Sequence, residues 1–325
     1  MWRKFPVLVL AVFLVGVMSI QSALGKEYPT RPIEIFVPYT AGSSFDIISR
    51  LVADAAPKYL GQPIIVVNKP GAGGSIAAAE IISSKPDGYK LVTLTNFFFA
   101  MTTKTQKIPF DPSYLTPMVN FTQAKLGVSV RGDSTWKTFN DLVDYARRNP
   151  GKLRWAHSGR GTVTHIPLLL IFRKVGVETI DIPYKGPPEI VSALLGGHID
   201  TAYVTYSAVK EHVRAGKIRI LVFTSDRRFS DPPDIPTVVE LGFPEVANLA
   251  TFIGLYAHKD TPEEVKKILL DAFKKTCEDP EWRKGIEKLG DEIKFAGPEF
   301  MKEVIRESED LSVPILKELG LYVGK

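Results

Sequence analysis

Cysteine is almost absent from this sequence. The only cysteine among the 325 residues is Cys277, so the chain cannot close an internal disulfide. It also has no cysteine cluster that could hold zinc or an iron–sulfur centre. The length is sufficient for about two domains of 100 to 200 residues, which bury enough apolar surface to fold without such covalent or metal crosslinks.

The sequence also lacks a run of charge of one sign. Its 41 basic and 36 acidic residues give a formal net charge of +5 and alternate through most of the chain. Proteins that bind nucleic acid concentrate their basic residues in a patch or stripe. We therefore expect no nucleic-acid partner, and the small positive excess fits a small anionic ligand better.

The motifs of the common nucleotide-dependent enzymes are missing too. The Gly-Lys pairs at 151–152 and 216–217 are each followed by an aliphatic residue rather than serine or threonine, so neither forms a phosphate-binding loop. The glycine-rich run at 70–74 lacks the dinucleotide-binding spacing and the acidic residue at the end of the next strand. We therefore expect no cofactor.

Hydrolase and metal-site motifs are equally missing. The sequence has no G-x-S-x-G or H-E-x-x-H segment, and residues 157–161 resemble an esterase loop only loosely. A secreted hydrolase is the enzyme alternative that this leaves. His157 and His165 are separated by a loop and have no carboxylate nearby in the sequence, so we predict polar lining or structural roles for them and no metal site.

A hydrophobic segment at the N-terminus indicates secretion. Arg3 and Lys4 precede an uncharged, mostly apolar run at 5–20, and small residues follow at Ala23 and Gly25. These features predict a cleavable signal peptide over residues 1–25 and a periplasmic or extracytoplasmic mature protein. The alternative is an uncleaved membrane anchor, although the apolar run is shorter than the roughly 20 residues that span a bilayer.

The remaining sequence alternates short apolar strands with helices, which predicts an α/β fold. Strands are expected at 33–38, 63–67, 91–95, 126–130, 153–157, 180–182, 199–204, 219–223 and 252–257. Helices are expected at 46–60, 75–84, 139–149, 165–175 and 188–195, followed by a mostly helical tail with new helices at Pro280 and Pro298. The first three strand–helix steps indicate a parallel sheet, and the later strands indicate a second α/β unit.

Two loops that follow predicted strands are suited to binding an anion. Residues 40–44 (Thr-Ala-Gly-Ser-Ser) open the first helix, and residues 157–162 (His-Ser-Gly-Arg-Gly-Thr) occupy the corresponding place in the second unit. Backbone N–H groups and hydroxyls converge at the positive end of a helix in such loops. Each loop could alternatively serve only as a helix cap. Two such loops facing each other across a cleft could hold a carboxylate without covalent chemistry.

Short segments spread along the chain carry a family resemblance. They lie at 28–33, 37–38, 68–74, 86–89, 109–112, 150–153, 183–186, 194–200 and 234–237, and they read YPTRPI, VP, NKPGAGG, PDGY, PFDP, PGKL, PYKG, LLGGHID and DIPT. In this order they resemble the Bug family of extracytoplasmic solute receptors, which serve tripartite tricarboxylate transporters.

This resemblance implies a binding protein rather than an enzyme. The implied fold is a two-domain clam shell like the type II periplasmic binding proteins, each domain a mainly parallel sheet flanked by helices. We place domain 1 at 26–104 plus 207–325 and domain 2 at 105–206, with hinges uncertain by about 20 residues. The implied partners are a small carboxylate and the membrane permease subunits of the transporter, with the receptor acting as a monomer. A ligand-sensing subunit of a signalling system is an alternative that the sequence does not separate from transport.

The resemblance also implies which residues contact the ligand. In the family, the loop after the first strand and the glycine loop of the second domain hold the carboxylate. The residues expected at the ligand are Thr40, Ala41, Gly42, Ser43, Ser44, Asp46, Asn96, His157, Ser158, Gly159, Arg160, Gly161, Thr162, His165 and Thr205. The chain departs from the family, which usually has two glycines in the first loop and serine where His157 stands, so the identity of the ligand stays open.

Aromatic residues near the predicted strand ends suggest an apolar pocket. We expect Phe45, Phe97, Trp155 and Tyr206 to line the cleft, because strand ends of α/β domains face the ligand crevice. Such a lining would favour an aromatic or long apolar carboxylate. The alternative is that the run of phenylalanines at 97–99 packs in the core.

Overall fold

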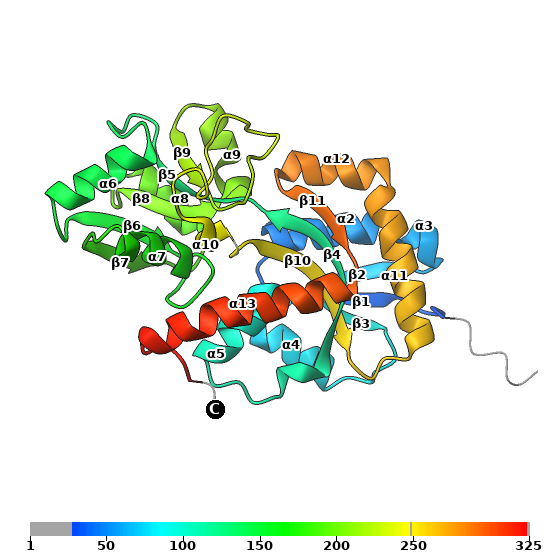
Figure 1. The fold of residues 1–325 in the computed structure, drawn as a ribbon. Helices are drawn as coiled ribbons and strands as arrows, with labels where there is room; N and C mark the ends of the chain where they lie inside the picture. Colours follow the sequence, from blue (N-terminus) through cyan, green and yellow to red (C-terminus); the bar gives the residue numbers. More distant parts are fainter. Residues whose placement is uncertain (1–27, 248, 324–325) are drawn as a thin grey trace, which may run out of the picture.

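The computed structural model describes residues 28–247 and 249–323, which form two α/β lobes (Figure 1). The predicted signal peptide lies outside the described residues. Among the described residues, no helix combines the length and the apolar character needed to span a membrane. Each lobe is built on its own sheet, as the sequence predicts.

The first lobe contains a six-stranded sheet in the order β11-β4-β10-β3-β1-β2. Its strands are β1 (Ile33–Val37), β2 (Ile64–Asn68), β3 (Lys90–Thr95), β4 (Leu115–Ala124), β10 (Thr251–His258) and β11 (Glu292–Ala296). β1 runs parallel to β2 and β3, whereas β10 runs antiparallel to β3 and β4. The sheet is therefore mixed rather than mainly parallel.

Helices cover both faces of this first sheet (Figure 1). Apolar side chains of α2 (Ser44–Ala55), α3 (Pro57–Leu60), α11 (Glu263–Glu278) and α12 (Pro280–Leu289) pack in one cluster with β1 and β4. Those of α4 (Ser75–Ile82), of the π-helical turn η3 (Phe98–Thr102) and of α13 (Pro298–Glu318) pack against the other face. Short turns η2 (Ala72–Gly74), α5 (Thr103–Thr105) and η4 (Pro112–Tyr114) complete the lobe.

The second lobe contains a five-stranded sheet in the order β7-β6-β8-β5-β9. Its strands are β5 (Leu126–Arg131), β6 (Leu153–His157), β7 (Thr179–Pro183), β8 (Thr201–Thr205) and β9 (Ile218–Phe223). α6 (Phe139–Arg148) and α7 (Ile166–Lys174) contribute to one hydrophobic cluster, and α8 (Pro187–Leu195) and α9 (Tyr206–Arg214) to another. β6 is parallel to β7 and β8, and β5 is antiparallel to β8 and β9, so this sheet is mixed as well.

The chain crosses between the two sheets at Lys125 and again between β9 and β10, a segment that includes α10 (Pro244–Ala247). The first crossing comes about 20 residues later than the boundary expected at 104–105, and the second lies between Phe223 and Thr251, after the boundary expected at 206–207. The first crossing lies inside one extended stretch, β4 followed by β5, interrupted only at Lys125. Local sequence patterns do not reveal that the two halves of such a stretch pair in different sheets.

A third contact joins the lobes at the end of α13. Phe97 and Leu316 from the first lobe share a hydrophobic cluster with Ile166 of α7. Nearby, Arg173 of α7 pairs with Glu318 of α13 at 2.7 Å. The C-terminal end of α13 therefore packs against the second lobe, as Figure 1 shows.

Candidate ligand-binding site

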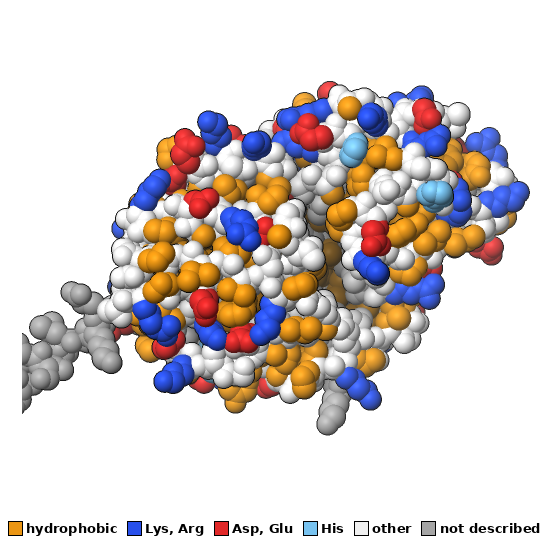
Figure 2. Space-filling view, turned by 180° about the vertical axis from the view of Figure 1, so that it is seen from behind, with side chains coloured by type: hydrophobic (Ala, Val, Ile, Leu, Met, Phe, Trp, Pro, Cys, Tyr) orange, Lys and Arg blue, Asp and Glu red, His pale blue; other side chains and the backbone are white. Residues whose placement is uncertain are grey.

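The surface is hollowed between the two lobes, as the space-filling view shows (Figure 2). Two contacts place the predicted loops where the lobes meet. The Ser44 hydroxyl of α2 lies 2.9 Å from the Ser207 hydroxyl of α9. On the other loop, a Cβ atom added at Gly161 would lie 2.9 Å from Thr105 Cγ2 of the first lobe. Both predicted loops therefore reach across from their own domain to the other.

The first loop, residues 40–44, is held from within by a buried carboxylate. Asp46 is 2% exposed and accepts hydrogen bonds from Gly42 N–H at 2.9 Å and from Asn68 at 2.8 Å. Arg50, one helical turn further on, donates to both of its oxygens at 3.0 Å. Burial alone would raise the pKa of the Asp46 carboxyl, but these donors lower it below its usual value. Asp46 thus positions the loop, and its oxygens are already occupied.

The start of α2 follows from the same loop. Ser43 caps the helix by accepting a hydrogen bond from Asp46 N–H, and Gly42 takes a left-handed φ of 84° that favours glycine. Thr40, Ala41 and Gly42 are exposed. The loop therefore presents backbone and hydroxyl groups to the solvent at the positive end of a helix.

The second loop, residues 157–165, joins β6 to α7 and is also held from within. Ser158 N–H donates to Thr164 Oγ1 at 2.9 Å, and the Thr162 hydroxyl donates to Gly159 O at 2.7 Å. Two glycine N–H groups donate to imidazole nitrogens, from Gly159 to His157 Nδ1 at 3.0 Å and from Gly161 to His165 Nδ1 at 3.3 Å. Pro167 lies in the first turn of α7, where a proline is tolerated.

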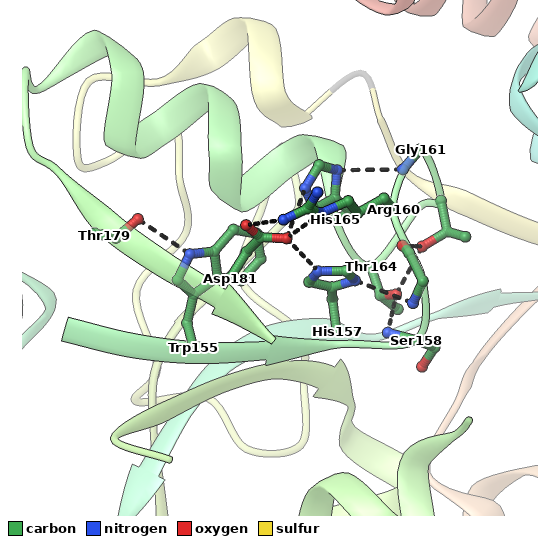
Figure 3. A network of polar contacts seen from close by, with 11 residues as sticks. Trp155, His157, Ser158, Arg160, Gly161, Thr164, His165, Thr179 and Asp181 are labelled. Atoms are coloured by element: carbon green, nitrogen blue, oxygen red, sulfur yellow. Dashed lines mark hydrogen bonds and ion pairs between the residues drawn. The ribbon is translucent and has the colours of Figure 1, made fainter. Parts of the chain in front are cut away.

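Beneath this loop lies a polar network centred on Asp181 of β7 (Figure 3). Asp181 accepts two hydrogen bonds from Arg160, at 2.7 and 2.9 Å, and one contact from His157 Nε2 at 3.1 Å. His165 Nε2 lies 3.8 Å from the same carboxylate. Burial opposes ionisation of Asp181, but Arg160 and His157 lower its pKa to about 2.

Both histidines are buried and neutral near pH 7. Burial lowers the pKa of His157, and burial together with the neighbouring His157 lowers the pKa of His165 to about 4. Trp155 supplies the apolar wall, since its ring is stacked on His165 with centroids 5.5 Å apart. The structural role predicted for the two histidines agrees with this placement.

The fold brings to the histidines a carboxylate that is distant in the sequence, Asp181. Ligand-type atoms of His157, His165 and Asp181 lie within 4.8 Å of one another, as in a two-histidine, one-carboxylate metal site. However, the Nδ1 atom of each ring accepts a hydrogen bond from a backbone N–H group, so Nδ1 carries no proton. In the neutral ring the proton is therefore on Nε2, the atom that faces Asp181. A metal at Nε2 requires the opposite arrangement, with Nδ1–H donating outward. The donor pattern therefore does not fit a metal.

Two other predicted site residues lie apart from the loops or at their edge. Asn96 is fully buried, and its amide bonds to Ala250 O, Ser308 Oγ and Phe252 N–H, which ties β3 to β10 and α13. Its side chain is therefore used within the first lobe. Thr205 precedes α9, and its hydroxyl accepts a hydrogen bond from Ser207 at 3.2 Å, beside Ser44.

Most of the predicted aromatic lining is buried. Trp155, Phe97 and Tyr206 are exposed by 3% or less. Phe45 is half-buried and packs against Tyr39, with ring centroids 4.4 Å apart. Phe45 is therefore the predicted aromatic that keeps an exposed edge beside the first loop, and Tyr39, which is 40% exposed, is its unpredicted partner.

Three residues at the site were missed by the sequence analysis: Ser207, Thr105 and Asp181. Ser207 could have been found, because it follows a predicted strand just as Ser44 does. Thr105 belongs to the turn α5, which the sequence does not signal. Asp181 lies in a predicted strand, but its proximity to His157 depends on the pairing of β7 with β6.

Comparison with known proteins agrees with this architecture. Residues 48–321 match the family described as tripartite tricarboxylate transporter family receptor. The chain belongs to this family. It is 37% identical to a protein of Cupriavidus necator described as "UPF0065 protein in gbd 5'region", over 92% of this chain and 90% of that one.

Solved structures share the fold. One described as a periplasmic transporter has a TM-score of 0.82 and 32% identity, covering 92% of this chain and all of that one. An R. palustris protein determined with adipate has a TM-score of 0.80 and 25% identity, covering 90% of this chain and 99% of that one. The family membership identifies the chain as a solute-binding receptor rather than an enzyme.

Proposed function

We propose that this receptor captures a small carboxylate between its two lobes and delivers it to the permease of a tripartite tricarboxylate transporter. The observation that carries the proposal is that each loop approaches the opposite lobe, the first at Ser207 of α9 and the second at Thr105 of α5. Each loop adjoins the N-terminal end of a helix, α2 or α7, where backbone N–H groups and the helix dipole favour an anion.

The charges at the site define how the carboxylate is held. The two arginines nearest the loops, Arg50 and Arg160, are both paired with carboxylates of their own lobe, Asp46 and Asp181. Neither guanidinium is therefore needed to neutralise the ligand. Several N–H groups of the loops, among them those of Gly42, Gly159 and Gly161, already donate within their own lobe. We infer that the remaining backbone N–H groups and hydroxyls of residues 40–44, 158–164 and 205 hold the carboxylate.

The body of the ligand is expected to be apolar. Phe45 and Tyr39 lie beside the first loop and offer a ring surface, whereas a hydroxylated ligand such as citrate needs polar partners throughout. We therefore expect aliphatic or aromatic carboxylates to bind more tightly than citrate or malate.

The site requires only one copy of the chain, since both loops belong to it, so we propose that the receptor acts as a monomer. The N-terminal sequence supports secretion through a cleavable signal peptide and a location outside the cytoplasm. The family and the proposed location support a permease partner.

A thermal-shift screen tests the proposal. At ligand concentrations a hundred times the dissociation constant, binding should stabilise the fold by about 2.7 kcal/mol and raise the melting temperature. We expect adipate, benzoate or a phthalate isomer to do so, with citrate and malate weaker. Stabilisation by citrate or malate alone would contradict the apolar preference, and no response to any carboxylate would contradict the proposed function.

A matched pair of variants then localises the site. Gly42 and Gly61 both have left-handed φ angles, 84° and 70°, and a Cβ atom at either would meet open space. Gly61 ends α3, away from the two loops. Gly42→Val and Gly61→Val should therefore carry similar backbone strain, but only Gly42→Val should abolish the carboxylate-induced shift. Equal loss of binding in both variants would refute the assignment of the first loop.

A further inference from the structure

The second loop depends on the tautomers of two buried histidines. His157 is fully buried and His165 is 4% exposed. The Nδ1 atom of each ring accepts a hydrogen bond from a glycine of the loop, Gly159 or Gly161. An imidazole accepts at Nδ1 only when that nitrogen is unprotonated, so the neutral rings must carry their proton on Nε2.

Asp181 is the carboxylate that both Nε2 atoms face. The separations are 3.1 Å from His157 and 3.8 Å from His165. A negatively charged acceptor at this place favours the proton on Nε2 in both rings and so keeps each Nδ1 free to accept. The same carboxylate holds Arg160, which belongs to the loop itself.

The charges around the histidines come from three elements. Asp181 lies on β7, Arg160 lies in the loop, and Arg173 lies on α7, where its charge also lowers the pKa of His165. Arg160 and Asp181 compensate each other. Protonation of either imidazole would therefore add an uncompensated charge to the buried network and would place an N–H against the N–H of a glycine.

We propose that Asp181 is a positioning residue of the ligand-binding loop: by fixing the Nε2–H tautomers of His157 and His165 it orients the Gly159 and Gly161 amides, and the loop keeps this form only while both rings are neutral. The effect on ligand binding rests on the proposed function. The tautomers and the loop conformation do not, and they can be measured without ligand.

The first measurement is nitrogen-15 NMR of the histidine side chains and of the glycine amides, on the ligand-free protein. Near pH 7 we expect both rings in the Nε2–H form and both amides protected from hydrogen exchange. On acidification, the Gly161 amide signal should shift together with the His165 ring, with a midpoint at about pH 4.

Three variants separate positioning from a general structural role. Asp181→Leu removes both the charge and the acceptor. We therefore expect mixed tautomers in the two histidines and loss of protection from hydrogen exchange at the Gly159 and Gly161 amides. Asp181→Asn keeps an acceptor, so the tautomers should be largely retained, but without the carboxylate the histidines should titrate at lower pH. Asp200→Asn is the matched control, because Asp200 also pairs with an arginine of the second lobe, Arg154, at 2.8 and 3.0 Å and is similarly exposed, 23% against 24%. Asp200→Asn should leave the tautomers and the titration of both histidine rings unchanged.

The consequence for binding is measured with adipate by calorimetry. We expect the dissociation constant to rise about tenfold in Asp181→Leu, the equivalent of one misplaced buried hydrogen bond, and to rise less in Asp181→Asn. Asp200→Asn should bind adipate as the wild type does. If wild type does not bind adipate, that part of the proposed function fails, and the NMR readout still decides the role of Asp181.

The proposal is overturned by any of three results. The first is a wild-type spectrum with Nδ1–H tautomers. The second is an Asp181→Leu variant that keeps the wild-type tautomers and the wild-type protection of the glycine amides. The far-ultraviolet circular dichroism spectrum checks that this variant is folded. The third is adipate binding of equal strength in wild type and in Asp181→Leu.

Discussion

The first and second loops are both held by hydrogen bonds from glycine N–H groups, but the acceptors differ. In the first loop, Gly42 N–H donates to the Asp46 carboxylate, and in the second, Gly159 and Gly161 donate to imidazole nitrogens. The carboxylate stays an acceptor at any pH above its lowered pKa. An imidazole stops accepting once it is protonated. The first loop should therefore be insensitive to mild acid, whereas the second loop depends on neutral histidines.

The largest effect is expected from Asp46→Ala, which removes the acceptor of the first loop. Gly42 N–H and Asn68 lose their partner, and Arg50 loses its ion pair. Because Arg50 is half exposed, we expect a loss of about 2 to 3 kcal/mol in the free energy of unfolding rather than the full cost of breaking a buried pair. Urea unfolding measures it. The control is Asp54→Ala, an exposed position of the same helix, and an equal loss there would contradict the role of Asp46.

Acidification should have a smaller effect, a loss of about 1 to 3 kcal/mol in the free energy of unfolding, and this loss should come from the second loop. The folded-state pKa of His165 is about 4, below its ordinary 6.5, so as pH falls through this window the unfolded chain takes up the proton first. Stability contributed by the neutral ring is therefore present above about pH 6.5 and is lost towards pH 4. His165→Asn keeps an acceptor for Gly161 and should flatten the pH dependence of the unfolding free energy.

The exposed His198 provides the comparison for this measurement. His198→Asn should leave the wild-type pH dependence in place. If His165→Asn and wild type lose the same stability between pH 6.5 and 4, the assignment of this loss to the second loop is wrong.

The smallest effect tests the contact of the second loop with the first lobe. Gly161 has a φ of 75°, and an added Cβ would lie 2.9 Å from Thr105 Cγ2. Gly161→Ala should cost about 1 to 2 kcal/mol in backbone strain and weaken carboxylate binding by hindering closure. Thr105→Ser removes Cγ2 and keeps the hydroxyl that bonds to Met101 O, so it should restore binding to Gly161→Ala without restoring stability. Failure of this rescue would show that Thr105 is not the obstacle.

The sequence predicted most of the strands and the two loops, because apolar periodicity and glycine–hydroxyl turns are local signals. It missed β4, whose Pro117 argues against a strand. It left open whether the phenylalanines at 97–99 line the cleft or pack in the core, and the structure buries them at a π-helical turn after β3. Local patterns leave open which side of such a turn faces the core.

The Asp181 network shows the other limit of sequence reasoning. Asp181 follows His157 by 24 residues, and the two meet only because β7 pairs in parallel with β6 in the register Trp155↔Asp181. The crossover through α7 brings the strands together, and that register is a tertiary property. A search for carboxylates near the histidines in sequence could not find it.

The placement of α13 makes the C-terminal end of this receptor suitable for detecting movements of the two lobes. Glu318 pairs with Arg173 of the second lobe, and Leu321 lies beside Gly161, so this end of the chain senses how the lobes are positioned. A solvatochromic dye attached through a cysteine introduced at Glu318 would experience a change of surroundings whenever the lobes move. The single native thiol, Cys277, is buried, which leaves the introduced one free for selective labelling. The fold thus offers a ready optical sensor for whichever carboxylate it binds.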